Sequence, residues 1–320
     1  MGLCYHYLRL NKQSDPFPRI LGTNIDEFQN HLSMLQKNYQ LISLEDASNL
    51  SYGGISFHKK NLGILITFDD GLADHYTAAK ILSELNISAI FFIPTCILEE
   101  KLPANPTIIH YTIAVFGIEK FLKEFRESLV NNKLDSKLFD LQYSKSKDNL
   151  GETISRIKST FKYKLGYYDS RKILLDIYKN LFSSEYKNML STIHLTESQI
   201  REMLEMGHHV GTHTYSHISV AATELNSDDF IKEIISPKNY LEQKFNTKVN
   251  SFSYPFGGKN DCLSSSELIK KTSEYNLAFT VEEILNTRNT SPYQLGRYQI
   301  NSSDTSFKLN SIIQNISKKN

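Results

Sequence analysis

The sequence of 320 residues has no tryptophan, only three cysteines and almost no net charge. The formal charge of +1 gives no reason to expect broad attraction to nucleic acid. Cys4, Cys96 and Cys262 are scattered and form no Cys-x-x-Cys pair, which argues against a thiolate zinc site and against a disulfide framework. We interpret them as small buried hydrophobic residues.

Long apolar runs are also missing. No window approaches the roughly 18 apolar residues of a membrane span, so we expect none. The first ten residues lack the apolar stretch of a signal peptide, and a cytoplasmic location is therefore expected, although a chain trimmed of an export signal would read the same way. What the sequence does contain is a 40% apolar fraction with 18 tyrosines and 18 phenylalanines, enough for one large α/β domain or two ordinary ones.

Short apolar runs alternate with helical patterns over most of the chain. Gly63 to Phe68 is uncharged and branched, as a buried parallel strand would be, and a helical pattern with Ala78, Leu82 and Leu85 on one face follows it. About eight such strands are expected, at 3–8, 41–44, 63–68, 88–94, 208–213, 249–255, 277–281 and 297–300. This rhythm predicts an α/β fold built as a closed or nearly closed barrel, with its chemistry at the C-terminal strand ends.

The alternation of strand and helix patterns stops between about residues 97 and 195. This segment reads as mostly helical, most clearly over 116–130 and 168–182, and its two histidines, His110 and His194, belong to no motif. Because core strands flank it on both sides, we expect one domain over residues 1–320 that a helical insertion interrupts, rather than two tandem domains.

Two adjacent carboxylates, Asp69 and Asp70, follow the buried strand at 63–68. Buried carboxylates are costly when unpaired, and two side by side repel each other. A bound cation would relieve both problems. A His-x-x-x-His pair, His213 and His217, follows another strand, and on one face of a helical turn both imidazoles would reach a single ion. Two histidines and one carboxylate form a common catalytic metal set with positions left for water.

A third motif, residues 253–258, reads Ser-Tyr-Pro-Phe-Gly-Gly. A strand that ends in proline, an aromatic residue and paired glycines makes a corner whose backbone amides turn outward. Such amides can stabilise an oxyanion. This signal is weak alone, because such corners are common.

Together the three motifs resemble the polysaccharide deacetylase family, carbohydrate esterase family 4. They are Thr-Phe-Asp-Asp-Gly at 67–71, Gly-Thr-His-Thr-Tyr-Ser-His at 211–217, and Tyr-Pro-Phe-Gly at 254–257, in the order of the family. The resemblance covers residues 1 to about 95 and 196 to about 301. It implies a distorted (β/α)7–8 barrel and one divalent metal ion, zinc as first choice with cobalt or nickel as alternatives.

The resemblance also assigns roles to residues. It implies Asp70, His213 and His217 as metal ligands, Asp69 as the general base, and an oxyanion-stabilising amide at Phe256. Tyr254, Pro255 and Arg297 are predicted to contact the substrate.

Two departures from the family pattern concern the proton transfers. The family often has an arginine where this chain has Ser253, and many members have a late histidine as general acid, whereas no histidine follows Phe256 here. The opening Tyr5-His6-Tyr7 resembles the N-terminal strand of a permuted branch of the family, so we predict His6 as the general acid. A His6 merely packed inside the barrel is the alternative. Arg297 is a candidate to orient Asp69 in place of the missing arginine.

The predicted function is hydrolysis of the N-acetyl group of an amino sugar, either in a surface glycan or in its nucleotide- or lipid-linked precursor. A deformylase, or another C–N amide hydrolase, uses the same scaffold and is an alternative. A catalytically inactive sugar-binding domain is another, since the motif arginine and the late histidine are missing. The sequence does not indicate an oligomeric state.

Overall fold

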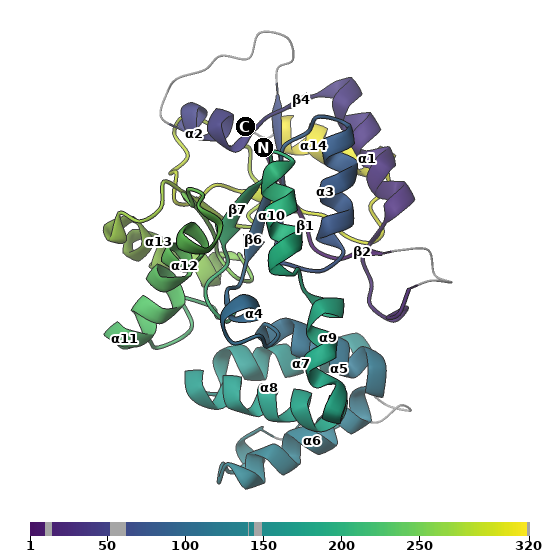
Figure 1. Cartoon of the computed structure of the whole chain (residues 1–320), viewed down its shortest axis with the longest axis vertical. Coiled ribbons are helices and arrows are strands. Elements are labelled where there is room, and N and C mark those ends of the chain that lie inside the picture. The colour runs from purple at the N-terminus through teal and green to yellow at the C-terminus, as the bar shows by residue number, and fades with distance from the viewer. Residues whose placement is uncertain (10–14, 52–61, 140, 144–148, 319–320) are drawn as a thin grey trace.

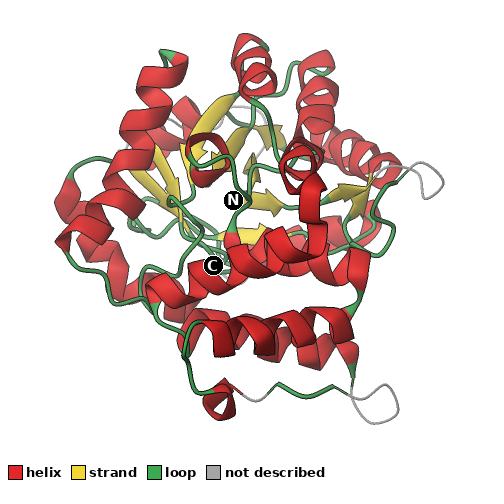
Figure 2. Ribbon diagram, turned by 60° about the horizontal axis from the view of Figure 1, so that its bottom comes forward, coloured by secondary structure: helices red, strands yellow, loops and turns green. Residues whose placement is uncertain are grey.

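The computed structural model describes residues 1–9, 15–51, 62–139, 141–143 and 149–318. Its centre is a parallel sheet that curls into a nearly closed barrel with helices around it, as Figures 1 and 2 show. The strands run in the order β10, β1, β5, β6, β7, β8, β9, and β4 pairs with the start of β5. Their bounds are β1 Gly2–Tyr5, β4 Gln40–Leu41, β5 Gly63–Phe68, β6 Ile90–Ile93, β7 His209–Thr212, β8 Ser251–Ser253, β9 Leu277–Phe279 and β10 Arg297–Gln299. The predicted α/β barrel is confirmed.

The barrel closes through the chain that leads into β10. Phe279 at the end of β9 forms a parallel bridge with Leu295, and the Thr280 amide donates to the Leu295 carbonyl over 2.8 Å. Two residues further on, Arg297 begins β10, the edge strand opposite β9, which pairs with β1. The sheet edges are therefore brought together by a short segment rather than by a full strand pair.

Helices cover the outside of the barrel because each presents an apolar face to it. On α1, Phe28, Leu32 and Leu35 are fully buried, as their spacing predicts. The covering helices are α1 Ile25–Asn38, α2 Leu44–Ser51, α3 His75–Glu84, α10 Glu197–Glu205, α11 Ser227–Phe230, α12 Ser236–Phe245, α13 Lys259–Thr272 and α14 Ser306–Lys318. Among the described residues, no helix has both the length and the apolarity to cross a membrane.

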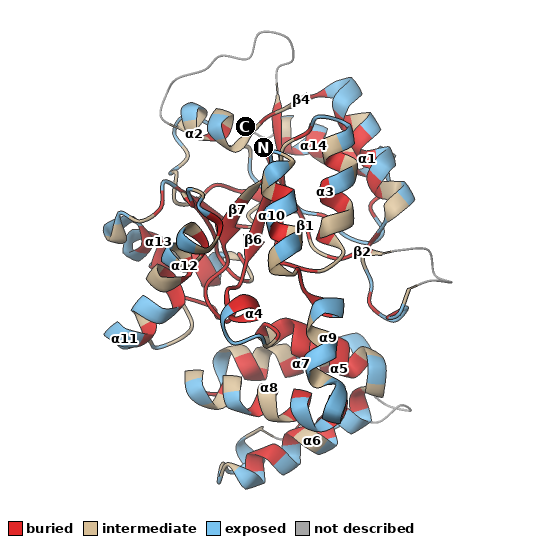
Figure 3. Cartoon of the chain, viewed as in Figure 1, coloured by how far each residue is buried: buried red, intermediate tan, exposed pale blue. Residues whose placement is uncertain are grey.

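The chain between β6 and β7 forms a layer of helices at one end of the barrel (Figure 1). These are α4 Cys96–Glu99, α5 Asn105–Phe116, α6 Ile118–Asn131, α7 Leu150–Tyr163, α8 Tyr167–Phe182 and α9 Tyr186–Ile193, with short 3-10 turns at Ser136–Phe139 and Ser183–Glu185. Buried residues lie inside this layer as well as inside the barrel (Figure 3). Its apolar cluster also takes in Tyr7 and Leu72, which follow β1 and β5. The helices therefore pack on the C-terminal ends of those strands.

Three local details differ from the sequence pattern or add to it. Asn24 caps α1 by accepting from the Asp26 amide, but Glu27 accepts from the Ser306 amide instead of completing a capping box. Two short strands, β2 Leu8–Arg9 and β3 Thr23–Asn24, pair in parallel. Their sequences contain no apolar run that would predict them. Close to Pro237 the chain forms a π-helical turn, Ile231–Ile235, directly before α12.

Candidate active site

The end of β5 sends its two carboxylates in different directions. Every residue of β5 is buried, and Asp69 and Asp70 after it are only 2% and 4% exposed. Asp70 has a φ of +81°, which is rare for a residue with a Cβ atom and typical of functional turns. This turn separates the two side chains, so that one reaches the histidines and the other reaches an arginine.

Asp70 lies against both histidines of the His-x-x-x-His pair. Its Oδ1 atom is 3.5 Å from Nε2 of His213 and 3.0 Å from Nε2 of His217. One buried oxygen that faces two imidazole nitrogens is the arrangement of ligands around a shared ion. The His213 Nδ1–H donates to the Ser253 carbonyl over 2.8 Å, so Nε2 is the nitrogen that faces Asp70 and would bind a metal.

The donor atoms of Asp70, His213 and His217 all lie within 4.8 Å of one another, and all three residues are buried. Burial alone would raise the pKa of Asp70, but His217 and His213 hold that pKa well below its usual value. The carboxylate is therefore ionised. Two nitrogens and one anionic oxygen are the donor set of catalytic zinc sites, so the residues present fit a divalent metal.

The two histidines do not sit on a helical turn, and that expectation was wrong. They follow β7 in a loop in which Thr214 and His217 have φ values of +58° and +65°. The Thr214 hydroxyl accepts from the His217 amide over 3.0 Å and replaces the missing helical hydrogen bond. A four-residue spacing can bring two imidazoles to one ion in such a loop as well.

Asp69 is bound by Arg297. The guanidinium donates to both carboxylate oxygens, over 2.8 and 2.7 Å, and its remaining N–H groups go to Thr67, Ser253 and the Thr280 carbonyl. Burial would raise the pKa of Asp69, but Arg297 lowers it far below its usual value. All five donors of the fully buried Arg297 are used within the protein. The predicted contact of Arg297 with substrate is therefore wrong; its side chain faces Asp69.

The third motif places one residue at the site and two in the core. The Phe256 ring packs edge-on against the His217 ring, with 4.8 Å between the ring centroids, and Phe256 has a φ of +65°. Among the described residues, none accepts a hydrogen bond from the Phe256 amide. Tyr254 is 1% exposed and donates to the Tyr293 carbonyl, and Pro255 is also buried. The predicted substrate contacts of Tyr254 and Pro255 therefore find no support.

His6 follows β1 and lies near both carboxylates. One of its ring nitrogens is within 4.8 Å of a carboxylate oxygen of Asp69 and of the Cys4 sulfur. Its backbone carbonyl accepts from His75, and its side chain is half-buried. His6 and Asp70 line one cavity of about 930 Å³. The ring is thus in the open site, not packed inside the barrel.

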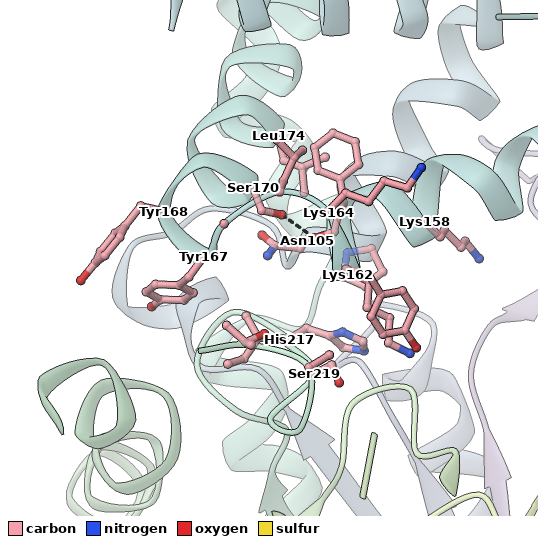
Figure 4. Close-up of a pocket in the computed structure, with 18 of the residues that line it drawn as sticks. Asn105, Lys158, Lys162, Lys164, Tyr167, Tyr168, Ser170, Leu174, His217 and Ser219 are labelled. Carbon is pink, nitrogen blue, oxygen red and sulfur yellow. Dashed lines mark hydrogen bonds between the residues drawn. The ribbon is translucent and has the colours of Figure 1, made fainter. Parts of the chain in front are cut away.

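A second cavity of about 470 Å³ lies beside the first, with His217 and Phe256 in its wall (Figure 4). Residues of α5, α7 and α8 line the opposite wall, so the helical layer overhangs the site. Lys158 of α7 lines both cavities, and His110 of α5 lines the larger one. Neither residue belongs to a motif, and the sequence contains no signal that would have placed them here.

Comparison with known proteins agrees with this geometry. Residues 181–274 match the polysaccharide deacetylase family model, a range that contains the second and third motifs but not Asp69 or Asp70. The chain resembles the polysaccharide deacetylases. This match supports a deacetylase, whereas a search of curated protein sequences found no match.

Solved deacetylase structures share the fold. The deacetylase PplD of Streptococcus pyogenes, in complex with acetate, has a TM-score of 0.59 at 18% identity, covering 97% of this chain and 96% of that one. IcaB of Ammonifex degensii has a TM-score of 0.54 at 16% identity and coverages of 98% and 96%. A de-N-acetylase of Aggregatibacter actinomycetemcomitans has a TM-score of 0.54 at 14% identity and coverages of 97% and 98%. At these identities the likeness establishes the deacetylase-type barrel only.

Proposed function

We propose that the chain is a metal-dependent hydrolase that removes the N-acetyl group of an amino sugar. The observation that carries the proposal is the division of two adjacent carboxylates, with Asp70 against two histidines and Asp69 against Arg297. A pure binding site has no need for this division. The substrate is a glycan or its nucleotide- or lipid-linked precursor, and the metal is zinc, with cobalt or nickel as alternatives.

In the proposed mechanism the site residues have separate tasks. A divalent ion held by Asp70, His213 and His217 would acidify a water molecule and polarise the acetamide carbonyl. Asp69, kept ionised by Arg297, accepts the proton of the attacking water. The unpaired Phe256 amide donates to the oxyanion of the tetrahedral intermediate. His6, on the larger cavity, protonates the leaving amine, because an amide anion is too poor a leaving group.

The test measures acetate. Chelator-treated protein is reloaded with zinc, cobalt or nickel and incubated with N-acetylated amino sugars in free, nucleotide-linked, lipid-linked and oligosaccharide form. We expect acetate release that depends on the metal. Release of formate from N-formyl analogues, without acetate release, would instead favour a deformylase. Saccharide binding with no turnover in any metal form would favour the inactive binding domain.

The general-acid role of His6 has a separate test. His6→Ala should lower turnover by about 10²-fold or more while the bound metal per chain stays the same, since His6 is outside the proposed ligand set. Unchanged turnover would return His6 to a structural role.

We also propose that residues 1–320 form a single deacetylase barrel domain interrupted at about 97–195. Strands β6 and β7 flank this segment in sequence and pair directly in the sheet, which supports the proposal. It predicts one cooperative thermal transition for the whole chain, whereas two separate transitions would indicate two domains.

A further inference from the structure

Lys158 occupies a special place in the helical layer. It is half-buried on α7, and it is the residue at which the two cavities of the site meet. Figure 4 shows its side chain on the other side of His217 from Tyr167 and Tyr168. Asp70 lines one of these cavities and His217 the other, so Lys158 lines the same two cavities as these proposed metal ligands.

The ammonium group of Lys158 has no partner among the described residues. Within the described ranges, no carboxylate forms an ion pair with it and no acceptor forms a hydrogen bond with it. Burial lowers the pKa of Lys158, and only the charge of Asp70 opposes this. Asp70 is already turned toward His213 and His217. Burial disfavours the charged form of this lysine and no described carboxylate compensates for that, so contacts within the described chain do not explain its position.

The other lysines on the wall of the smaller cavity differ in this respect. Lys162, one helical turn from Lys158, has its Nζ atom 2.6 Å from a carboxylate oxygen of Asp261. Lys164 is exposed to solvent, where an unpaired charge costs little. Of these three lysines, Lys158 alone is half-buried and has no described carboxylate that neutralises its charge.

A second unpaired polar atom lies on the same cavity. His110 has its Nδ1 atom 2.8 Å from the Tyr7 hydroxyl, and its Nε2 atom is buried with no partner among the described residues. Burial, followed by the charge of Lys158, lowers the pKa of His110 to about 3, so the ring is neutral. One cation and one neutral polar group near each other form the kind of pair that binds an oxyanion.

We propose that Lys158 is a substrate-binding residue that recognises an anionic group on the amino sugar, and that the substrate class is an N-acetylated amino sugar bearing a phosphate or a carboxylate. This inference rests on the proposed function. The anion neutralises Lys158, and His110 offers a further hydrogen bond. A neutral sugar would leave the ammonium group without a counter-charge.

The test compares the binding of matched probes by isothermal titration calorimetry. The neutral probes are the methyl glycosides of N-acetylglucosamine and N-acetylgalactosamine, the phosphate probes are the 1-phosphates of the same sugars, and the carboxylate probe is N-acetylmuramic acid. The proteins are the zinc-loaded wild type, Lys158→Met, Lys158→Arg and Lys164→Met as the matched control. We expect the wild type to bind one class of anionic probe about tenfold to a hundredfold more tightly than its neutral partner.

Lys158→Met should lose this preference while its affinity for neutral probes changes less than twofold, and Lys158→Arg should keep part of it. Lys164→Met should behave as the wild type. The class of probe that is preferred decides between phosphate and carboxylate. Because no described residue pairs with Lys158, Lys158→Met should melt at the same temperature as the wild type or higher. Equal affinity for neutral and anionic probes in the wild type, or a preference that survives in Lys158→Met, would overturn the inference.

The same samples separate this inference from the proposed function. Acetate release from neutral and anionic sugars at equal efficiency would leave the deacetylase standing and remove the role of Lys158. Anion-selective binding that Lys158→Met abolishes, without acetate release from any probe, would leave the binding role and remove the deacetylase.

Discussion

At the scale of single residues, the site depends on how differently two neighbouring carboxylates are surrounded. Asp69 faces a guanidinium that uses two N–H groups on it, and Asp70 faces two imidazoles. Arg297 thus holds Asp69 in one orientation, whereas Asp70 lies against the two imidazoles with which it would share a cation. The positive φ of Asp70 makes this separation possible.

Asp69→Asn should lower kcat by about 10²- to 10⁴-fold, because an amide cannot accept the proton of the attacking water. It should also lower the free energy of unfolding by about 3 kcal/mol, since Arg297 is fully buried and would lose its counter-charge. The bound metal per chain should not change. Steady-state kinetics, metal analysis and urea unfolding measure the three effects.

Ser253→Ala provides the comparison for this variant. Ser253 donates to Asp69 over 3.0 Å and accepts from Arg297 over 2.8 Å, but carries no charge. Its removal should cost about 1 kcal/mol and little turnover. Full activity of Asp69→Asn would refute the assignment of Asp69 as base.

The individual residues show what a sequence can and cannot predict. The motifs identified Asp69, Asp70, His213 and His217, because side chains that follow parallel strands meet at one end of a barrel even when, as here, one strand lies between them. The sequence suggested two tasks for Arg297, contact with the substrate and orientation of Asp69, and did not decide between them. Its true position depends on β10 pairing with β1, beside the strand that carries Asp69, and no local pattern reveals that pairing.

At the scale of elements, the loop that carries the two histidines is held by a distant helical turn. Glu233, in the π-helical turn before α12, is fully buried and accepts from the amides of Tyr215 and Ser216, each over 3.0 Å. Its other oxygen accepts from the hydroxyls of Ser216 and Tyr167, over 2.7 and 2.8 Å. The break that accommodates Pro237 thus also supplies the anchor of the proposed metal loop.

Glu233→Gln should weaken metal binding by about tenfold to a hundredfold, because an amide has one accepting oxygen where the carboxylate has two. Zinc titration in competition with a chelator of known affinity measures this change. Glu205→Gln, at an exposed position on α10, is the matched control and should bind zinc as the wild type does. An unchanged affinity in Glu233→Gln would mean that the loop holds its shape without this anchor.

The helix caps show why local patterns succeed in one place and fail in another. Thr196 and Gln199 form a capping box, as a Thr-x-x-Gln pattern predicts, since both partners belong to the same turn. At α1 the same pattern fails, because Glu27 accepts a hydrogen bond from the amide of Ser306 at the start of α14. The predicted amphipathic helices at 116–130 and 168–182 are present as α6 and α8, since their apolar faces are continuous.

At the scale of the whole molecule, an ion pair next to the site connects the helical layer with the helices around the barrel. Lys162 of α7 bonds to Asp261 of α13, and its Nζ atom also lies 4.1 Å from the centre of the Phe256 ring. Both partners are largely buried, and Asp261 also accepts from Ser219. This contact links the inserted helices to the corner that carries the proposed oxyanion donor.

Lys162→Met should lower the free energy of unfolding by about 3 kcal/mol, since it leaves Asp261 buried without a counter-charge. Adding Asp261→Asn should recover part of this loss, with a coupling energy of about 1–3 kcal/mol in the double-mutant cycle. Guanidinium unfolding of the four proteins measures it. Additive effects of the two substitutions would show that the pair is not coupled.

Buried histidines link the stability of the whole chain to pH. His31, His75 and His208 lie in different elements, and in each the Nε2–H donates to a backbone carbonyl, over 2.7, 2.8 and 2.9 Å. Burial lowers the pKa of all three, that of His75 to about 4. In the unfolded chain a histidine titrates near 6.5. Between pH 6.5 and 4 these three rings therefore bind fewer protons in the folded chain than in the unfolded one, and their contribution to stability falls as the pH falls, whereas Asp74, whose pKa burial raises to about 8, acts in the opposite direction.

For His75 the shift from about 6.5 to about 4 corresponds to about 3 kcal/mol, which is fully present above pH 6.5 and lost by pH 4. Guanidinium unfolding of chelator-treated protein at pH 7, 6 and 5 should show midpoints that decrease steadily. His75→Gln removes one titrating ring, so its midpoints should decrease less steeply even if the variant is less stable at pH 7. Equal slopes for the two proteins would mean that His75 titrates normally when folded, and that protonation of Nδ1, which accepts from the Leu72 amide, costs the folded chain nothing.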